Sequence, residues 1–260
     1  MTPARTVKPL SGWRVLIPRG GEWGNGVAAA VRRLGATPVV APMINFASPR
    51  NTAALTESLT RLRNGDYDWL VVTSATTVDV LLSQELRVPD RTKIAAVGET
   101  TSSALALAGY RVDFVPEKDN SSRGLVKFWP ASPRGSRVLV PQSENSDDVL
   151  ISGLGSLDIS AEFVTAYRTV GVPVSGEVAR EVRTGRINGV LITSGSVARQ
   201  IQVQLAPLPP GTVVAATGPR TAFDARTAGI SVNVIAEART AESLVDAFVD
   251  HVTWQARHAG

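Results

Sequence analysis

The strongest constraint on the fold is a pattern of short apolar runs and helical segments that occurs twice along the 260 residues of this chain. The run RVLIP at 14–18 is repeated as RVLVP at 137–141, 123 residues later. Other blocks recur in the same order at an offset of 120: VVTS (71–74) with LITS (191–194), AAVG (95–98) with AATG (215–218), and AGYRV (108–112) with AGISV (228–232). This ordered set predicts an internal duplication. Two copies predict a two-lobed protein, since a solenoid needs at least three repeats.

Within each copy, strand signals alternate with helix signals. Residues 14–18 lead into a Gly-rich turn and a helical pattern at 27–34, which Gly35 ends as a C-cap. The turn contains Gly20, Gly21, Gly24 and Gly26. Further strands are expected at 37–41, 68–73, 94–97 and 112–115, an extended stretch at 43–46, and helices at 52–62, 77–82, 102–108 and 121–128. Such alternation is typical of α/β proteins with mostly parallel sheets.

The composition excludes several kinds of catalysis. The chain has no Cys, so a thiolate nucleophile, a disulfide, a zinc-thiolate site and an iron-sulfur cluster are excluded. Its two His, His251 and His258, lie in the C-terminal tail, where fraying is expected. We therefore expect no His-based triad, no imidazole base and no metal site. Any proton transfer has to use Tyr, a carboxylate or the substrate itself.

Charge and hydropathy limit the partners. The 27 basic and 23 acidic residues include no long basic run, so no nucleic-acid partner is expected. No apolar run approaches the roughly 20 residues of a membrane helix, and the first residues lack the apolar stretch of a signal peptide. We therefore expect a cytoplasmic protein without a membrane partner.

Turns rich in Ser and Thr follow equivalent strands in both copies, at 73–77 and 193–196 and again at 98–101 and 218–221. In open α/β sheets, ligands bind beyond the carboxyl ends of the strands, where free N–H groups of helix N-termini point outward. The alternative is that these Ser and Thr side chains only cap the helices. Their recurrence at the same edge of both lobes favours a binding role.

A dinucleotide site has to be weighed, because GNGVAA at 24–29 matches the GxGxxA pattern. Its Gly residues come several positions too late after the strand, and Asn45 stands where an acidic residue would bind the ribose. The residues after Gly26 do not complete a Walker A motif either. We therefore expect no nucleotide cofactor.

Two further side chains leave two interpretations open. Tyr167 lies in an extended apolar segment at 163–170, where a Tyr suits either packing or catalysis. Arg19, at the end of the first strand, can either meet an anion or pair with Glu22.

Six segments, by their order and spacing, resemble the uroporphyrinogen-III synthase family. They are VLIPR (15–19), VVTSATTVDVLL (71–82), VGETTSSAL (97–105), AYRT (166–169), LITSGSVAR (191–199) and TGPRTA (217–222). The resemblance implies an α/β fold of two flavodoxin-like parallel-sheet lobes, internally duplicated and joined by a two-stranded crossover. It also implies a discontinuous lobe one (1–42 plus 174–260), a lobe two at 49–165, and crossing linkers at 43–48 and 166–173.

For function, the resemblance implies a cofactor-free, monomeric hydro-lyase of tetrapyrrole (heme) biosynthesis. Such an enzyme closes hydroxymethylbilane to uroporphyrinogen III through a spiro intermediate, with inversion of the terminal D ring and loss of water. The preceding deaminase would hand over the bilane. Tyr167 matches the family's Tyr at the crossing segment and is implied as the general acid. The implied substrate-binding residues, which would meet eight carboxylates in one cleft, are Arg19, Ser74, Thr101, Ser194, Arg220 and Thr221.

Two positions depart from the family pattern. Gly195 stands where the family commonly has Pro after the second Thr-Ser pair, and Gln142 replaces a basic residue often found after the strand at 137–141. A different class of function also fits the residues, namely a two-lobed cytoplasmic binding or sensor protein for an anionic small molecule.

Overall fold

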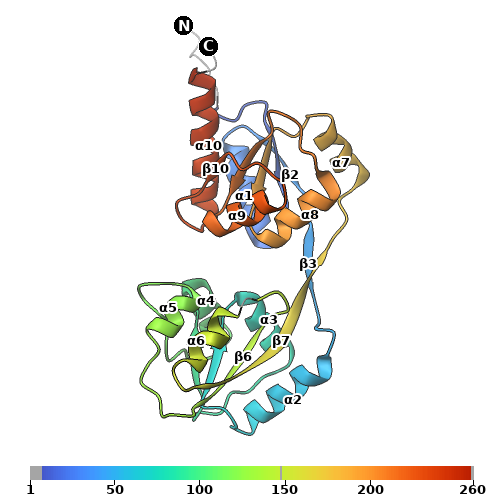
Figure 1. The fold of residues 1–260 in the computed structure, drawn as a ribbon. Helices are drawn as coiled ribbons and strands as arrows, with labels where there is room; N and C mark the ends of the chain where they lie inside the picture. The colour runs from blue at the N-terminus through green and yellow to red at the C-terminus, as the bar shows by residue number, and fades with distance from the viewer. Residues whose placement is uncertain (1–7, 147, 259–260) are drawn as a thin grey trace. The chain divides into compact units, whose positions relative to one another are not determined.

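A computed structural model describes residues 8–146 and 148–258 (Figure 1). The chain forms two compact units. Unit 1 contains the described residues up to Asn45 and from Val170 onward, and unit 2 is Phe46–Thr169. Both boundaries fall inside strands, β3 (Ile44–Ala47) and β7 (Ser160–Gly171), which pair with each other. The α/β fold with two five-stranded sheets confirms the predicted fold class.

The sheet of unit 1 is parallel at every pairing. Its strands are β1 (Arg14–Ile17), β2 (Thr37–Val40), β8 (Gly189–Ile192), β9 (Val213–Ala216) and β10 (Val234–Ile235), in the order β10-β9-β8-β1-β2. Leu16 of β1 lies opposite Val39 on one side and Val190 on the other. Counted along the chain, the strand order is that of flavodoxin-like proteins, in which ligands bind at the carboxyl edge of the sheet.

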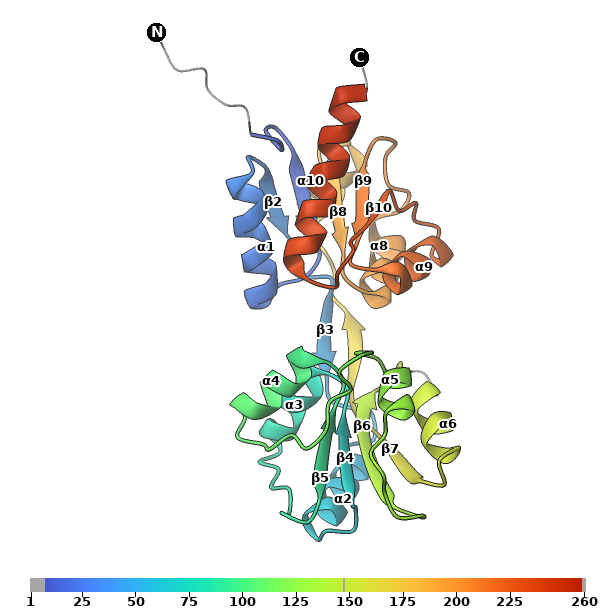
Figure 2. The same cartoon turned by 90° about the vertical axis from the view of Figure 1, so that its left-hand side faces the viewer.

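Helices cover both faces of the unit 1 sheet. They are α1 (Gly21–Arg33), α7 (Gly176–Arg183), α8 (Gly195–Leu205), α9 (Pro219–Thr227) and α10 (Ala241–His258). Helices α1 and α10 lie side by side on one face (Figure 2), where Val31 and Phe248 share one apolar cluster. Ile201 and Ala225 belong to the cluster on the other face. Because the sheet is covered on both sides, β8 and β9 are buried at every position.

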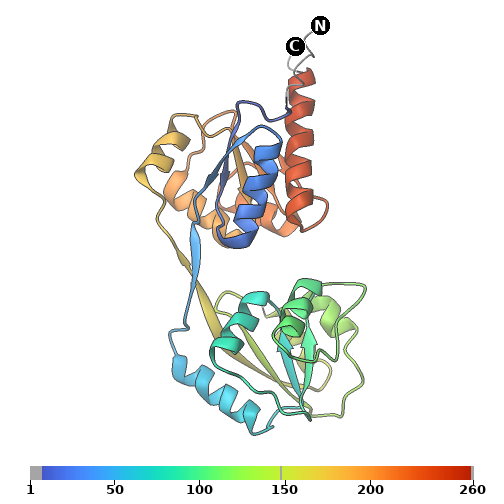
Figure 3. The ribbon, with the colours of Figure 1, turned by 180° about the vertical axis from the view of Figure 1, so that it is seen from behind.

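Unit 2 repeats this architecture with the chain order permuted. Its strands are β3, β4 (Trp69–Val72), β5 (Lys93–Ala96), β6 (Arg137–Ser143) and β7, in the order β3-β7-β6-β4-β5. Strands β6 and β7 correspond to β1 and β2, but they come last in the chain of unit 2 instead of first. Strand β3 adds an edge beside β7, which Figure 3 shows as a blue strand along a yellow one.

The helices of unit 2 also lie on both faces of their sheet. They are α2 (Thr52–Arg63), α3 (Ala75–Ser83), α4 (Glu99–Leu107), α5 (Ser122–Lys127) and α6 (Val149–Gly155). Leu59, Leu81 and Leu105 bring α2, α3 and α4 into one apolar cluster, whereas Leu125 and Leu154 bring α5 and α6 into the other.

The predicted duplication is confirmed by the element boundaries. Strand β4 begins 120 residues before β8, α3 before α8, β5 before β9, and α4 before α9. The two units therefore present the same four elements in the same order. In each unit, two neighbouring strands are each followed by a helix that begins at the carboxyl end of the strand. Within these four elements, a difference in chemistry between the units comes from side chains at corresponding positions.

Three local predictions are wrong. Helix α1 begins at Gly21, so Gly24 lies inside the helix, where a Cβ would clash with the carbonyl oxygen of Arg19. This glycine allows close packing and does not form a turn. The strand expected at 112–115 is reduced to a single bridge between Ala95 and Phe114.

The third concerns the C-terminal segment, which does not fray within the described residues. Helix α10 continues to His258, because Leu244, Phe248 and Val252 recur at helical spacing and are buried. No helix of the described residues is long and apolar enough to cross a membrane.

Candidate active site

Two serines begin the equivalent helices α3 and α8. Ser74 precedes α3 with extended backbone, and its Oγ accepts the N–H of Thr77 at 3.1 Å. Ser194 takes the same role before α8, where its Oγ accepts the N–H of Val197 at 3.3 Å. Both serines are N-caps, as the alternative interpretation predicted. Both also stand at the carboxyl ends of central strands and stay partly accessible.

An irregularity in β7 directs Tyr167 into unit 2. Gln142 of β6 lies opposite Thr165, but the next residue, Ser143, lies opposite Tyr167. Strand β7 therefore carries an extra residue, Ala166, which interrupts the alternation of side chains. Ala166 and Tyr167 are both buried in the apolar cluster on the α2, α3 and α4 face.

The bulge brings two predicted site residues together. The Tyr167 hydroxyl lies 3.2 Å from Ser74 Oγ, and 9% of the tyrosine is exposed. The Phe46 ring packs edge-on against the Tyr167 ring, with centroids 5.3 Å apart. The phenol is thus held at the start of α3, where the positive end of the helix dipole and free N–H groups favour negative charge.

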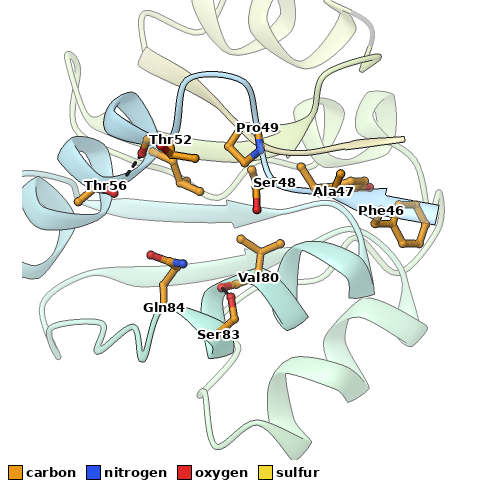
Figure 4. Close-up of a pocket in the computed structure, with 12 residues that line it drawn as sticks. Phe46, Ala47, Ser48, Pro49, Thr52, Thr56, Val80, Ser83 and Gln84 are labelled. Carbon is orange, nitrogen blue, oxygen red and sulfur yellow. Dashed lines mark hydrogen bonds between the residues drawn. The ribbon is translucent and has the colours of Figure 1, made fainter. Parts of the chain in front are cut away.

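A cavity of about 240 Å³ lies beside the Tyr167 ring. Figure 4 shows its walls, which come from β3, the start of α2 and the end of α3. Ser48, Thr52, Thr56, Ser83 and Gln84 supply polar groups, but none of the lining residues is charged. The hydroxyls of Thr56 and Ser83 donate to carbonyl groups of their own helices, at 3.0 and 2.7 Å. The cavity therefore suits a neutral group better than a carboxylate.

The second pair of predicted threonines opens α4 and α9. Thr101 stands in the first turn of α4 and is 4% exposed. Helix α4 follows Gly98, whose φ of 83° favours glycine, and no side chain caps its first N–H groups. In α9, the Thr221 hydroxyl lies 3.3 Å from that of Thr217, which lies 3.2 Å from the carbonyl oxygen of Thr193. Within the described residues, no hydrogen bond joins Thr101 to Ser74 or Tyr167.

The two predicted arginines belong to unit 1. Arg220 is 70% exposed, and its Nε lies 3.1 Å from the Asp224 carboxylate. The Arg19 guanidinium lies 5.2 Å from the centre of the Trp23 ring. Burial lowers the pKa of Arg19 from its ordinary value, although an arginine stays charged in proteins. No ion pair joins Arg19 to Glu22 in the described part of the chain, where the guanidinium lies against Trp23 instead.

Gly195, the departure from the family pattern, is explained by the neighbouring acid. A Cβ at this position would clash with Oδ2 of Asp224. The absence of a side chain at Gly195 therefore leaves space for the Asp224 carboxylate, which pairs with Arg220. The other departure, Gln142, lies inside β6, which continues to Ser143.

Two further hydroxyls of this site, those of Thr77 and Thr217, were not among the predicted substrate-binding residues. Thr77 is fully buried, and its Oγ1 lies 2.9 Å from Ser74 Oγ. Its position three residues after a capping serine is the one signal in the sequence, because that spacing places two side chains together at a helix start. Thr217 shows no comparable spacing.

These arrangements suit acid catalysis and anion binding. Tyr167 can donate a proton, and the hydroxyls, helix starts and arginines can bind carboxylates. No three His, Asp or Glu side chains gather in a group that could hold a metal within the described residues. The fold and the site define an internally duplicated α/β protein with a serine-capped helix start at the carboxyl edge of each sheet, and in unit 2 the capping serine lies within hydrogen-bond distance of the Tyr167 hydroxyl.

Comparisons with known proteins identify the family. The model of the family described as uroporphyrinogen-III synthase HemD matches residues 25–246. The chain therefore belongs to the uroporphyrinogen-III synthase family, whose members are cofactor-independent hydro-lyases of tetrapyrrole biosynthesis. This confirms the family predicted from the six segments.

Two curated relatives are each 25% identical to this chain. A uroporphyrinogen-III synthase from Synechococcus elongatus matches over 92% of the chain and 95% of its own length. A porphyrin biosynthesis protein HemD from Ruminiclostridium josui matches over 94% of the chain but 49% of its own length, so the chain spans about half of that protein.

Solved structures share the fold. A mutant uroporphyrinogen III synthase from Thermus thermophilus aligns with a TM-score of 0.65 at 18% identity, over 93% of this chain and 99% of the other. The uroporphyrinogen-III synthetase of Helicobacter pylori aligns with a TM-score of 0.62 at 14% identity, over 92% and 98%.

Proposed function

We propose that this chain cyclises hydroxymethylbilane to uroporphyrinogen III, with inversion of the terminal D ring and loss of water. The observation that carries the proposal is the family match over residues 25–246. The hydrogen-bonded pair of Tyr167 and Ser74 supports it, because the reaction needs a proton donor and the chain has neither Cys nor a His in this unit.

Tyr167 is the proposed general acid. The C–O bond of the terminal hydroxymethyl group breaks, its electron pair leaves with the oxygen, and that oxygen takes the phenol proton and departs as water. The electron pair of the neighbouring pyrrole stabilises the cation that remains. The substituted α-carbon of ring D attacks this cation and forms the spiro intermediate. The older bond from that carbon to the neighbouring methylene bridge then breaks, its electron pair returns to ring D, and a second pyrrole-stabilised cation remains at the bridge. The free α-carbon of ring D attacks the bridge and loses its proton, which restores the phenol. The sum is loss of one water without a cofactor.

The carboxylates of the bilane are the proposed ligands of the Ser/Thr turns in each unit. In unit 2 these would be bound by Ser74 and by the start of α4 with Thr101. In unit 1 they would be bound by Ser194, Thr221, Arg19 and Arg220, with the arginines making charge-assisted hydrogen bonds. Binding in a defined conformation is the main task, because the bilane closes unaided to the wrong isomer.

The same proposal covers the setting of the enzyme. We expect a cytoplasmic monomer in which residues 43–48 and 166–173 act as linkers, and hand-over of the bilane from the preceding deaminase. Hand-over would shorten the time in which the free bilane closes by itself.

A coupled assay tests the function. Porphobilinogen and the preceding deaminase supply the bilane, this protein is added, and the products are oxidised and separated as isomer I and isomer III porphyrins. We expect isomer III in proportion to the protein added. Isomer I alone, from protein shown to be folded, would rule the activity out.

A further inference from the structure

A third hydroxyl joins the pair formed by Ser74 and Tyr167. Thr77 is 0% exposed, and its Oγ1 lies 2.9 Å from Ser74 Oγ. Ser74 Oγ lies in turn 3.2 Å from the Tyr167 hydroxyl. We refer to these three groups as the hydroxyl chain.

The direction of the hydrogen bonds in the hydroxyl chain follows from counting donors. A hydroxyl has one O–H and two lone pairs, and one lone pair of Ser74 accepts the N–H of Thr77 at 3.1 Å. Ser74 therefore accepts from one hydroxyl neighbour and donates to the other. If Ser74 donated to Thr77, the Thr77 O–H would be buried without an acceptor, since its hydroxyl bonds to Ser74 alone in the described part of the chain. Such an orphaned donor is costly.

We propose that Thr77 is a positioning residue that fixes this direction: Thr77 donates to Ser74, Ser74 donates to Tyr167, and the phenol proton stays free for the substrate. The inference rests on the proposed function, because it concerns the proton that Tyr167 gives to the leaving hydroxyl. Once that proton is transferred, the Ser74 O–H faces a phenolate and its hydrogen bond becomes stronger. The bond from Thr77 polarises Ser74 in the same direction.

Unit 1 shows the same helix start without this third hydroxyl. Val197 takes the position of Thr77 in α8 and is 0% exposed, while Ser194 still caps the helix. A valine is therefore compatible with the packing at this position. This makes Thr77→Val a substitution that removes the hydroxyl at nearly constant shape.

The experiment compares kcat and KM of five variants in the coupled assay, one of which is Tyr167→Phe. Thr77→Val is expected to lower kcat about fivefold at unchanged KM, because loss of one hydrogen bond leaves the Tyr167 proton free to turn toward Ser74. Thr77→Ser should restore kcat. Thr92→Val is the matched control, since Thr92 is a buried threonine of the same unit whose hydroxyl donates to the Tyr67 carbonyl at 2.7 Å. It should leave kcat unchanged.

The fifth variant combines Thr77→Val with Tyr167→Phe. Without the phenol, the direction of the hydroxyl chain has no effect, so the double variant should match Tyr167→Phe alone. The inference would be overturned by a further fivefold loss of kcat in the double variant, or by a wild-type kcat in Thr77→Val. In either case, formation of isomer III by the wild type would still support the proposed function. Isomer I alone from the wild type would overturn both. Thr77→Ala repeats the test if the valine variant does not fold.

Discussion

The two units carry the same helix starts but different side chains at corresponding positions. In unit 2, Thr77 continues the hydroxyl chain from Ser74 to Tyr167, whereas unit 1 has Val197 at that place. In unit 1, Arg220 pairs with Asp224, whereas unit 2 has Thr100 and Ala104 at the corresponding positions. At these corresponding positions, the additional hydroxyl is therefore in unit 2 and the guanidinium is in unit 1.

This difference in side chains shows which features of a duplicated fold are kept in both copies and which are not. The cap at the first helix start is retained in both units, because Ser74 and Ser194 stabilise the local fold in the same way. The residues around each cap differ between the units, as Thr77 and Val197 show. Under the proposed function, both units bind carboxylates, and unit 2 also assists the leaving group.

Tyr167→Phe should have the largest effect, because it removes the general acid from unit 2. We expect kcat to fall about 10²-fold with little change in KM, as is usual for loss of a general acid. The coupled assay measures both values. Tyr110→Phe is the control, since the Tyr110 hydroxyl donates to the Leu86 carbonyl at 2.8 Å and lies outside the site. Equal rates for Tyr167→Phe and the wild type would return Tyr167 to a packing role.

The sequence predicted the scaffold well because its signals are local and repeated. The apolar runs of β4 and β8 and the Ser that follows each run fix where α3 and α8 begin. The sequence could not predict the bulge at Ala166, because a one-residue shift between β6 and β7 depends on pairing across the sheet. Because the bulge could not be predicted, the contact between Tyr167 and Ser74 and the role of Thr77 could not be predicted either.

Removal of the capping hydroxyl in each unit tests the comparison directly. Ser74→Ala and Ser194→Ala should each lower the free energy of unfolding by about 1 kcal/mol, because each deletes an N-cap. Ser74→Ala should also lower kcat about tenfold, since Tyr167 loses its hydrogen-bond donor. Urea unfolding gives the first quantity and the coupled assay the second. An equal loss of kcat in both variants would mean that the units do not divide the chemistry.

Arg220→Ala tests the contribution of unit 1. We expect KM to rise about fivefold at unchanged kcat, because a charge-assisted hydrogen bond to a substrate carboxylate is lost. Arg226→Ala removes the same charge from an exposed position of α9 and should leave KM unchanged. If both variants raise KM equally, net charge and not a specific contact attracts the substrate.

The amino-terminal edges of the sheets also differ between the units. In unit 1, Arg14 bonds both oxygens of Glu181 on α7 at 2.7 and 2.8 Å. In unit 2, the position of Glu181 is taken by Arg61, which bonds Glu162 on β7 at 2.8 Å. Desolvation alone would raise the pKa of Glu162. The nearby Tyr67 hydroxyl, Arg61 and the Ser58 hydroxyl outweigh it and lower this pKa below its ordinary value.

Glu162→Gln should have the smallest effect and depend on pH. A carboxylate with a lowered pKa stabilises the fold above its unfolded pKa of about 4.3, and this stabilisation is lost as the pH falls through the folded pKa. Because about a third of the Glu162 side chain is exposed (35%), we expect a loss of at most about 1 kcal/mol at pH 7. Urea unfolding of the variant and the wild type should give equal stabilities well below a pH of about 4.3. A difference that persists at low pH would assign the effect to packing of Glu162 and not to its charge.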